Sequence, residues 1–595
     1  MPFARLPPLP IRAQEMRASA LATLLAFALI GPSLAHATAE AANIEIGDTL
    51  TGNYLAALVA NEDHDASAAA AYFREALRAD PRNQDILARS FAAALESGAF
   101  VDASVLADRV LAHDPGNSLA RLTGAARAIS DGQFSAARLQ LGQGDAGRAR
   151  DITTTLIDAW AYAGAGDLRR ALAVADRITD PKVQSFKNFH AGLIAETLGD
   201  SAEAQRRLKS AYEADKGTLR LVDAYGRFLS RHNDAEGAKA VYRDFAKIAG
   251  RQALVEAAQA ELAAGRVLER LVHNAREGAA EVLYGLGAGG GSEGDEIAEI
   301  IYLRLALQLR PDHALAAVTL GDLLNQIKQG DAAIKAFGAL PTDSPLRESA
   351  DIQAALTLDT LSRPADALKR MREIVEAHPR DIEALTAYAS LQRAGKDFAG
   401  AAITYSQALE IIGAPEKTYW SIYYFRGICY ERSKRWPLAE ADFKKALELF
   451  PEQPLVLNYL GYSWIDQGLN LDEAFNMLRR AVELKPNDGY IVDSLGWAHY
   501  KLGHYREALD QMEKAVALKP ADPTINDHLG DVYWRVNRKN EAHFQWNHAR
   551  DMSPDEDDLP AILKKIQNGL SDVAATSPAA NQDEAAPAAP KKDGG

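Results

Sequence analysis

The 595-residue sequence contains a single cysteine, Cys429, and only 7% aromatic residues. One thiol excludes an intramolecular disulfide framework and any zinc site that needs several cysteines. Basic residues are also outnumbered: the sequence has 66 Lys and Arg residues and 81 Asp and Glu residues, which gives a formal net charge of -15. Without a basic cluster such a chain repels nucleic acid, so we expect no nucleic-acid partner. The hydrophobic fraction of 47% still supports a packed core and excludes global disorder.

Sequence signatures of metal binding are missing as well. No H-E-x-x-H motif occurs, which removes the nucleus of a metalloprotease. The closest histidine pairs, His499/His504 and His543/His548, are five residues apart, whereas two ligands on one helix face need a spacing of three or four. We therefore predict no metal, no cofactor and no enzymatic activity.

One long apolar run is present, from Ala18 to Leu34. Three arginines precede it, and Ala35-His36-Ala37 supplies small residues at both positions that a signal peptidase reads. We predict a signal peptide of residues 1–37 that is cleaved after Ala37, and export of the mature chain to a periplasm. An uncleaved membrane anchor is the alternative, and any other membrane contact is expected only through partners.

A repeat of 34 residues organises the chain that follows. Its clearest units begin at Trp420, Pro454, Gly489 and Pro523, and further units begin near Leu50, Gln84, Ser118, Ile152, Ser185, Leu219, Ala314, Glu348 and Ile382. In the unit from Trp420, the small residues Gly427, Ala439 and Ala446 accompany the large Phe443, and Pro451 closes the unit. Small residues let two helix backbones approach closely, a large residue fills the remaining space, and proline ends the second helix. Each unit is therefore predicted to be a helical hairpin.

This pattern resembles the tetratricopeptide repeat, and together with the signal segment it makes the chain similar to exported bacterial members of that family. The resemblance covers 13 units and most of residues 50–556. It implies an all-α fold in which helical hairpins stack into a right-handed superhelical solenoid.

The repeat frame also divides the chain into segments. We predict an N-terminal array over residues 38–250, a degenerate repeat over 251–313, a middle array over 314–412, an aromatic-rich C-terminal array over 413–556, a capping helix over 557–570 and a disordered tail over 571–595. In the degenerate repeat, Gly285, Gly287 and Gly290 fit the nucleotide-binding spacing G-x-G-x-x-G, but no strands alternate with helices around them. We interpret residues 285–291 as a flexible loop that lets the solenoid bend.

Six of the seven tryptophans lie in the C-terminal third of the chain. In the tetratricopeptide family, five positions of the first helix of each hairpin line a concave groove that holds a partner segment. Carried over to this sequence, these positions predict a partner-binding groove at Tyr424, Asn458, Tyr462, Asp466, Tyr490, Asp493, Trp497, Tyr500, Lys501, Asp527, Asp531, Trp534 and Arg535. Rigid aromatic side chains bury a large area at small entropic cost, which suits a binding site. A merely bulky superhelix core is the alternative.

The family's two-carboxylate clamp, which is built from Lys and Asn, is not reproduced here. Asn458 fits one position of that clamp, but Asp493 and Asp527 stand where a neutral or basic side chain is needed. We expect these aspartates to repel a carboxylate ligand. The groove would then favour an apolar or basic peptide, or a folded partner with a basic patch.

The sequence thus predicts a periplasmic scaffold or adaptor that binds other proteins in cell-envelope assembly. Carbohydrate binding by the same groove is the alternative, because Trp and Tyr beside Asp and Asn also suit sugar rings. A second alternative is an enzyme with an unrecognised active site. A repeat fold alone does not name a function, so the partner and the oligomeric state stay open at this point.

Overall fold

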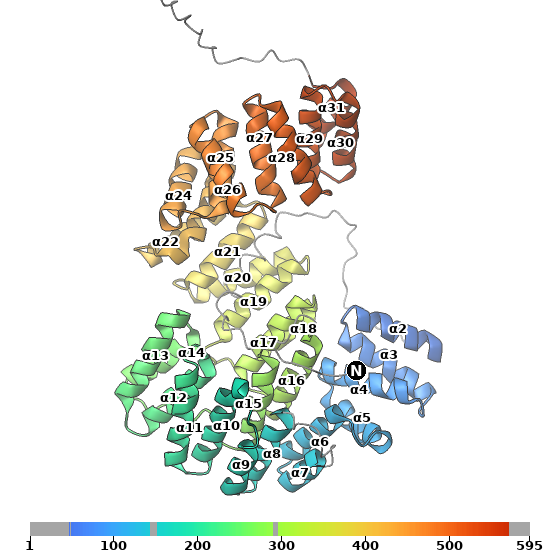
Figure 1. Ribbon diagram of the computed structural model, residues 1–595, viewed down its shortest axis with the longest axis vertical. Coiled ribbons are helices and arrows are strands. Elements are labelled where there is room, and N and C mark those ends of the chain that lie inside the picture. The colour runs from blue at the N-terminus through green and yellow to red at the C-terminus, as the bar shows by residue number, and fades with distance from the viewer. Residues whose placement is uncertain (1–46, 48, 143–151, 290–294, 571–595) are drawn as a thin grey trace, which may run out of the picture. The chain divides into compact units, whose positions relative to one another are not determined.

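Figure 1 shows the computed structural model of the chain, which describes residue 47 and residues 49–142, 152–289 and 295–570. Every regular element in these ranges is a helix, so the predicted all-α fold is confirmed. None of the helices in the described part is both long and apolar enough to cross a membrane. The predicted signal peptide, the predicted tail and residues 290–294 of the glycine-rich stretch lie outside the described residues.

Residues 290–294 also carry the spacing G-x-S-x-G. This spacing marks a hydrolase nucleophile when it forms a sharp turn between a strand and a helix. The helices on either side of it, α15 (Ala275–Gly287) and α16 (Glu296–Leu309), do not provide that setting. The spacing therefore does not indicate a hydrolase.

Consecutive helices pair into antiparallel hairpins. The helices up to residue 394 are α2 (Leu50–Glu62), α3 (Ala66–Ala79), α4 (Gln84–Ser97), α5 (Phe100–His113), α6 (Ser118–Ser130), α7 (Phe134–Gly142), α8 (Ile152–Gly164), α9 (Leu168–Ala175), η2 (Pro181–Val183), α10 (Gln184–Thr197), α11 (Ser201–Ala214), α12 (Leu219–Arg231), α13 (Ala235–Ala249), α14 (Ala253–Ala263), α15, α16, α17 (Ala314–Gln326), α18 (Gly330–Gly338), α19 (Arg347–Thr360), α20 (Pro364–Ala377) and α21 (Ile382–Ala394). They are followed by α22 (Phe398–Ile412), η3 (Lys417–Tyr419), α23 (Trp420–Arg432), α24 (Trp436–Leu449), α25 (Pro454–Gln467), α26 (Leu471–Leu484), α27 (Gly489–Lys501), α28 (Tyr505–Leu518), α29 (Pro523–Arg535), α30 (Lys539–Asp551) and α31 (Leu559–Asn568).

The hairpins close on the small residues that the repeat predicts. A Cβ atom on Gly427 would lie 2.7 Å from the Phe443 ring, and one on Gly530 would lie 2.5 Å from the Trp546 ring. Both aromatic rings are fully buried. Glycine at this position therefore lets the first helix of a hairpin rest directly on an aromatic side chain of the second helix.

Local sequence also specifies the turns and the helix starts. Gly503 and Asn537, which lie in the turns inside two hairpins, have left-handed backbone conformations with φ of 81° and 68°. Glycine and asparagine tolerate this conformation better than other residues do. The side chains of Asp488 and Asp522 accept hydrogen bonds from backbone N–H groups at the starts of α27 and α29. The residues of each of these hairpins thus specify where its helices begin and where its turn lies.

The described residues form two compact units, the first ending at Leu391 and the second beginning at Gln392. This division does not coincide with the predicted boundary at residue 413. The reason is that α22 packs on α23 within the second unit. The Tyr405 and Phe425 rings stack at 6.5 Å, and Nη1 of Arg426 donates to Oγ of Ser406 at 3.0 Å.

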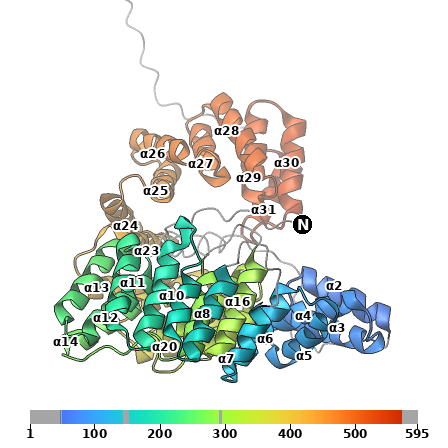
Figure 2. The ribbon, with the colours of Figure 1, turned by 60° about the horizontal axis from the view of Figure 1, so that its bottom comes forward.

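The α15–α16 hairpin of the first unit departs from the simple order of a stacked array. α15 packs against α6, α8 and α10, and α16 packs against α4 and α6, all of which are first helices of their hairpins (Figures 1 and 2). The prediction of a flexible loop is wrong for Gly285 and Gly287, which lie in α15 against the side chains of Phe186 and Leu303. Close packing, rather than bending of the chain, is the reason for glycine at these two positions.

Candidate functional site

The predicted groove residues lie on α23, α25, α27 and α29, the first helices of four successive hairpins in the second unit. Their spacing of about three or four residues places them on one face of each helix. α25 packs on α27, and α27 packs on α29. The faces of α25, α27 and α29 join into one surface, which we call the C-terminal concave surface after the predicted groove.

An aromatic stack joins α27 to α29 on this surface. The Trp497 ring lies 4.8 Å from the Tyr500 ring and 4.0 Å from the His528 ring, with interplanar angles of 14° and 19°. Nδ1 of His528 is bonded to the Asp493 carboxylate at 3.0 Å. Burial lowers the pKa of His528, but the adjacent Asp493, with smaller contributions from Asp527 and Asp531, more than offsets this effect and the pKa lies above its ordinary value. Asp493 therefore stabilises a protonated imidazole beneath the indole ring.

His528 was missed by the sequence prediction. It follows the predicted residue Asp527, and its partner Asp493 lies 35 residues earlier, close to one repeat. First helices of neighbouring hairpins are adjacent in a solenoid. A search for acid and base residues one repeat apart would therefore have found this pair.

Two further predicted aspartates are paired with α31. Lys565 donates to Asp527 at 2.6 Å and to Asp531 at 2.8 Å. Asp531 also accepts from Nε1 of Trp546 at 2.9 Å, and burial raises the pKa of Asp531 above its ordinary value. Asp493 and Asp527, which we expect to repel a carboxylate ligand, are thus each paired with a basic side chain of the chain itself, His528 and Lys565.

The end of α31 covers Trp534, another predicted groove residue. A Cβ atom on Gly569 would lie 2.0 Å from the Trp534 ring, and Nζ of Lys539 lies 3.7 Å from the centre of that ring. The Trp534 ring also lies 5.4 Å from the buried Trp546 ring. Trp534 is therefore part of the packing under the cap.

Tyr424 lies in the core of the second unit. It is 8% exposed, and its ring lies 6.0 Å from Trp420 and 5.9 Å from Tyr459. Burial raises the pKa of Tyr424 far above its ordinary value. The structure thus assigns Tyr424 a packing role instead of the predicted groove role.

The other predicted residues remain at least partly exposed. They are Asn458, Tyr462, Asp466, Tyr490, Trp497, Tyr500, Lys501 and Arg535. Lys501 donates to Asp466 at 3.1 Å, and Arg535 donates to Oη of Tyr500 at 3.4 Å. Oδ1 of Asn458 is buried without a hydrogen-bond partner among the described residues. The accessible part of the C-terminal concave surface is therefore centred on α25 and α27.

The electrostatic environment of Tyr462 is negative. Burial, followed by the nearby Asp466 and Asp493 carboxylates, raises the pKa of Tyr462 to about 12. Arg432 acts in the opposite direction, and Asp558, which precedes α31, adds to the effect of the two carboxylates. A cation placed beside the Tyr462 ring would be stabilised by these carboxylates and by the face of the ring.

The described part of the chain shows no constellation for metal or thiol chemistry. It contains no group of three or more His, Cys, Asp or Glu side chains placed to hold a metal ion. Cys429 is buried, and burial raises the pKa of its thiol to about 12. The thiolate form, which is the nucleophile, is therefore suppressed at neutral pH.

Comparison with known proteins gives one family. Family models described as tetratricopeptide repeat match residues 60–127, 352–415, 420–453 and 492–522. A TPR repeat-containing protein of Pseudomonas aeruginosa is 30% identical over 88 residues, which is 15% of this chain and 15% of that protein.

Several solved structures also match. The APC/C hetero-tetramer Cut9–Hcn1 aligns with 14% identity and a TM-score of 0.37, over 87% of this chain and 96% of the other. A tetratricopeptide repeat protein from Parabacteroides merdae aligns with 19% identity and a TM-score of 0.36, over 42% of this chain and 98% of the other. YrrB, a TPR protein with an unusual peptide-binding site, aligns with 23% identity and a TM-score of 0.25, over 33% of this chain and 97% of the other.

The family models fall in both compact units and coincide with helical hairpins that close on the small residues of the repeat. The chain therefore contains tetratricopeptide repeats in both units.

Proposed function

We propose that the protein is a binding scaffold that is exported to a periplasm and holds an extended segment of a partner protein on the C-terminal concave surface. The observation that carries this proposal is the partly exposed aromatic row of Tyr462, Trp497 and Tyr500 on two adjacent first helices. Aromatic side chains in such a row supply large contact area with little entropy to lose. A cell-envelope role is part of the proposal and rests on the predicted signal peptide.

The chemistry of the surface favours a partner segment with apolar residues and at least one Lys or Arg. The apolar residues would contact the aromatic row, and the cation would lie near Tyr462, where three carboxylates lower the potential. The Asn458 amide, whose Oδ1 has no partner among the described residues, would accept a backbone N–H of the segment. Each hairpin would add one strip of contact.

The test is an in-cell crosslinking pull-down with the full chain and with Tyr462→Ala and Tyr490→Ala variants. Tyr490 is 37% exposed, so its substitution removes mainly surface area, whereas Tyr462 is partly buried and also packs on the neighbouring core. The matched control is Phe544→Ala on the second helix α30, where Phe544 is 66% exposed and lies off the concave surface. Circular dichroism verifies that all variants stay helical.

We expect a defined set of envelope proteins to crosslink to the wild type and to Phe544→Ala, and to be reduced at least about tenfold with Tyr462→Ala. Equal capture by all variants would show that the partner binds elsewhere. Competition of the captured set by glycan fragments at high salt would instead favour the carbohydrate alternative. Export is tested separately, by N-terminal sequencing of the mature protein, which should begin at Thr38.

A further inference from the structure

The concave face of the N-terminal array in the first unit is occupied by the chain's own α15–α16 hairpin. This face is formed by the first helices α4, α6, α8, α10 and α12. α15 packs on α6, α8 and α10, and α16 packs on α4 and α6 (Figure 1). The hairpin therefore lies where the resemblance to the family places a partner.

α15 presents a stripe of three residues to this face, Gly278, Glu281 and Gly285. Their spacing of about three and four residues puts them on one side of the helix. A Cβ atom on Gly278 would lie 2.4 Å from the Trp160 ring, and one on Gly285 would lie 2.5 Å from the Phe186 ring. The array thus supplies an aromatic wall, and the hairpin supplies a stripe of minimal side-chain volume that fits against it.

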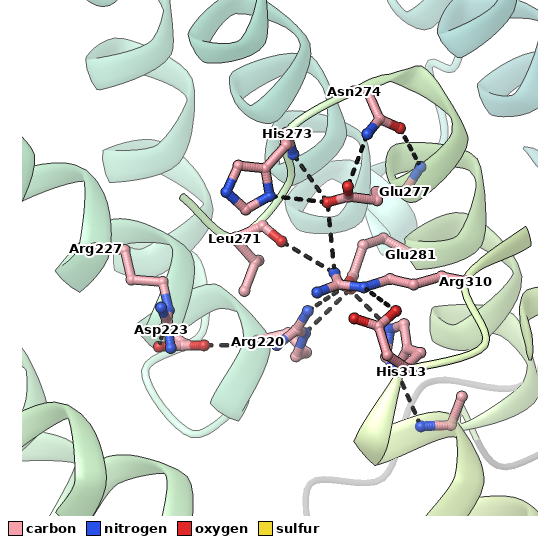
Figure 3. A network of polar contacts seen from close by, with 12 residues as sticks. Arg220, Asp223, Arg227, Leu271, His273, Asn274, Glu277, Glu281, Arg310 and His313 are labelled. Carbon is pink, nitrogen blue, oxygen red and sulfur yellow. Dashed lines mark hydrogen bonds and ion pairs between the residues drawn. The ribbon is translucent and has the colours of Figure 1, made fainter. Parts of the chain in front are cut away.

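Between these two glycines, Glu281 connects the hairpin to the array through polar contacts (Figure 3). Its carboxylate is 1% exposed and accepts from Nε of Arg220 at 3.1 Å and from Nε2 of His313 at 3.0 Å. Nδ1 of His313 accepts the backbone N–H of Ala316 at 3.1 Å, which leaves the ring proton on Nε2. Burial alone would raise the pKa of Glu281, but Arg220 and His313 lower it well below its usual range. The carboxylate is therefore ionised in the interface.

Arg220 is oriented independently of the hairpin. Its guanidinium lies 3.5 Å from Asp223 on the same helix, and Asp223 also accepts from Arg227 at 2.8 Å (Figure 3). Asp223 accepts a further hydrogen bond from Oη of Tyr242 at 2.8 Å. These four residues all belong to the array. A carboxylate-binding arginine would therefore stay in place if the hairpin left.

The interface between hairpin and array contains buried polar groups beside a continuous apolar core that includes the fully buried Leu283 of α15. Nε of Arg304 on α16 donates to the backbone oxygen of Glu96 at 3.2 Å, and burial raises the pKa of the Glu96 carboxyl to about 7. In the wall, Nε1 of Trp160 donates to Nδ1 of His190 at 3.2 Å, while Nε2 of His190 is buried without a partner among the described residues. Buried charges offset their desolvation only while every partner is present, so these polar contacts stabilise the interface less than apolar contacts of equal area would.

We propose that the α15–α16 hairpin is a displaceable internal occupant of this face, and that the face binds in its place a helix of a partner protein with a small residue, a glutamate three residues later and a second small residue four residues after that. The proposal concerns a surface of the first unit and is independent of the function proposed for the C-terminal concave surface. The chain's own hairpin would compete with the partner, which makes the contact autoinhibitory.

The test uses the full chain and a fluorescently labelled peptide of residues 275–287. Anisotropy titrations measure peptide binding to the wild-type chain, to Glu281→Gln and to Glu277→Gln. Glu277 is the matched control because it lies on the same helix but accepts from His273 and Asn274, which belong to the hairpin's own approach segment. A second peptide carries Glu281→Gln.

We expect the wild-type peptide to bind the Glu281→Gln chain at least about tenfold more tightly than the wild-type chain, because a weaker internal contact raises the fraction of open molecules. The Glu277→Gln chain should behave as the wild type, and the substituted peptide should bind about tenfold more weakly. Absence of binding to every chain, or equal affinity for all three, would overturn the proposal.

Hydrogen exchange of the wild-type chain gives a second readout that does not depend on the folding of a variant. We expect the amides of α15 and α16 to exchange faster than those of α8 and α10, in an opening that leaves the array protected. Equal protection of the hairpin and the array would show that the hairpin is a fixed part of the core, and would overturn the proposal.

Discussion

The N-terminal array of the first unit and the C-terminal concave surface of the second are built from the same repeat but differ in what covers their concave sides. In the first unit, α15 and α16 pack against five first helices or their side chains. In the second, α31 is the one element among the described residues that covers the end of the surface, through Lys565 and Gly569. The repeat therefore predicts a groove, whereas segments outside the repeat frame determine whether that groove is covered.

The first prediction contrasts a buried ion pair of the first unit with an exposed one of the second. Glu281→Ala removes the closer of the two buried carboxylates that face Arg220 and should lower the free energy of unfolding of the first unit by about 3 to 5 kcal/mol. Asp466→Ala breaks the exposed pair with Lys501 and should lower that of the second unit by less than about 1 kcal/mol. Urea unfolding followed by hydrogen exchange resolves the two units. Equal effects would contradict the assigned difference in burial.

The second prediction concerns the cap. Lys565→Met removes the cation that faces both Asp527 and Asp531 and should destabilise the second unit by about 2 to 3 kcal/mol. Tryptophan fluorescence should shift to the red, because Trp534 loses its cover as α31 loosens. The neighbouring Lys564→Met is the control, since Lys564 is exposed and no ion pair involving it is found among the described residues. An unchanged second unit would show that the two aspartates need no cation.

Histidines give the two units opposite responses to pH. The pKa of His528 is raised above its ordinary value of 6.5, so its stabilising contribution is complete below pH 6.5 and is lost as the pH rises through the folded-state pKa. Burial lowers the pKa of His190 to about 3. Below pH 6.5 the unfolded chain therefore binds a proton at His190 that the folded chain does not, and the first unit loses stability progressively as the pH falls.

The difference in free energy of unfolding between the wild type and a variant measures the contribution of each histidine. The advantage of the wild type over His528→Asn should be larger at pH 5.5 than at pH 8.5. Its advantage over His190→Asn should shrink by about 1.4 kcal/mol per pH unit below pH 6.5. Thermal unfolding at several pH values measures both differences, and slopes of the same sign would refute the assignment.

The smallest expected effects concern glycine. Gly278→Ala should destabilise the first unit by about 1 kcal/mol, because the added Cβ collides with Trp160 and outweighs the better helix propensity of alanine. Gly530→Ala should act similarly on the second unit, where the collision is with Trp546. Gly338→Ala, with no atom within 4 Å of its Cβ, should be neutral or slightly stabilising. Denaturant midpoints compare the three, and a destabilised Gly338→Ala would contradict the steric explanation.

Much of the candidate site could be predicted because it depends on repeat positions. Tyr462, Trp497 and Tyr500 lie on accessible faces of first helices, as the carried-over positions require. Tyr424 and Asp531 occupy equivalent positions but are buried. Their neighbours differ, since Trp420 and Tyr459 surround Tyr424, while α31 contributes the lysine that pairs with Asp531.

The sequence by itself determined the helical hairpins, their period and their closure, because those depend on residues such as Gly427 and Phe443 that are close together in the chain. Only the tertiary structure decided that the N-terminal groove is filled. The contacts that fill it join residues 61 positions apart, as in Arg220 and Glu281, or 208 apart, as in Arg304 and Glu96. Such contacts depend on the curvature that accumulates from a small rotation at every repeat, and no local pattern encodes that sum.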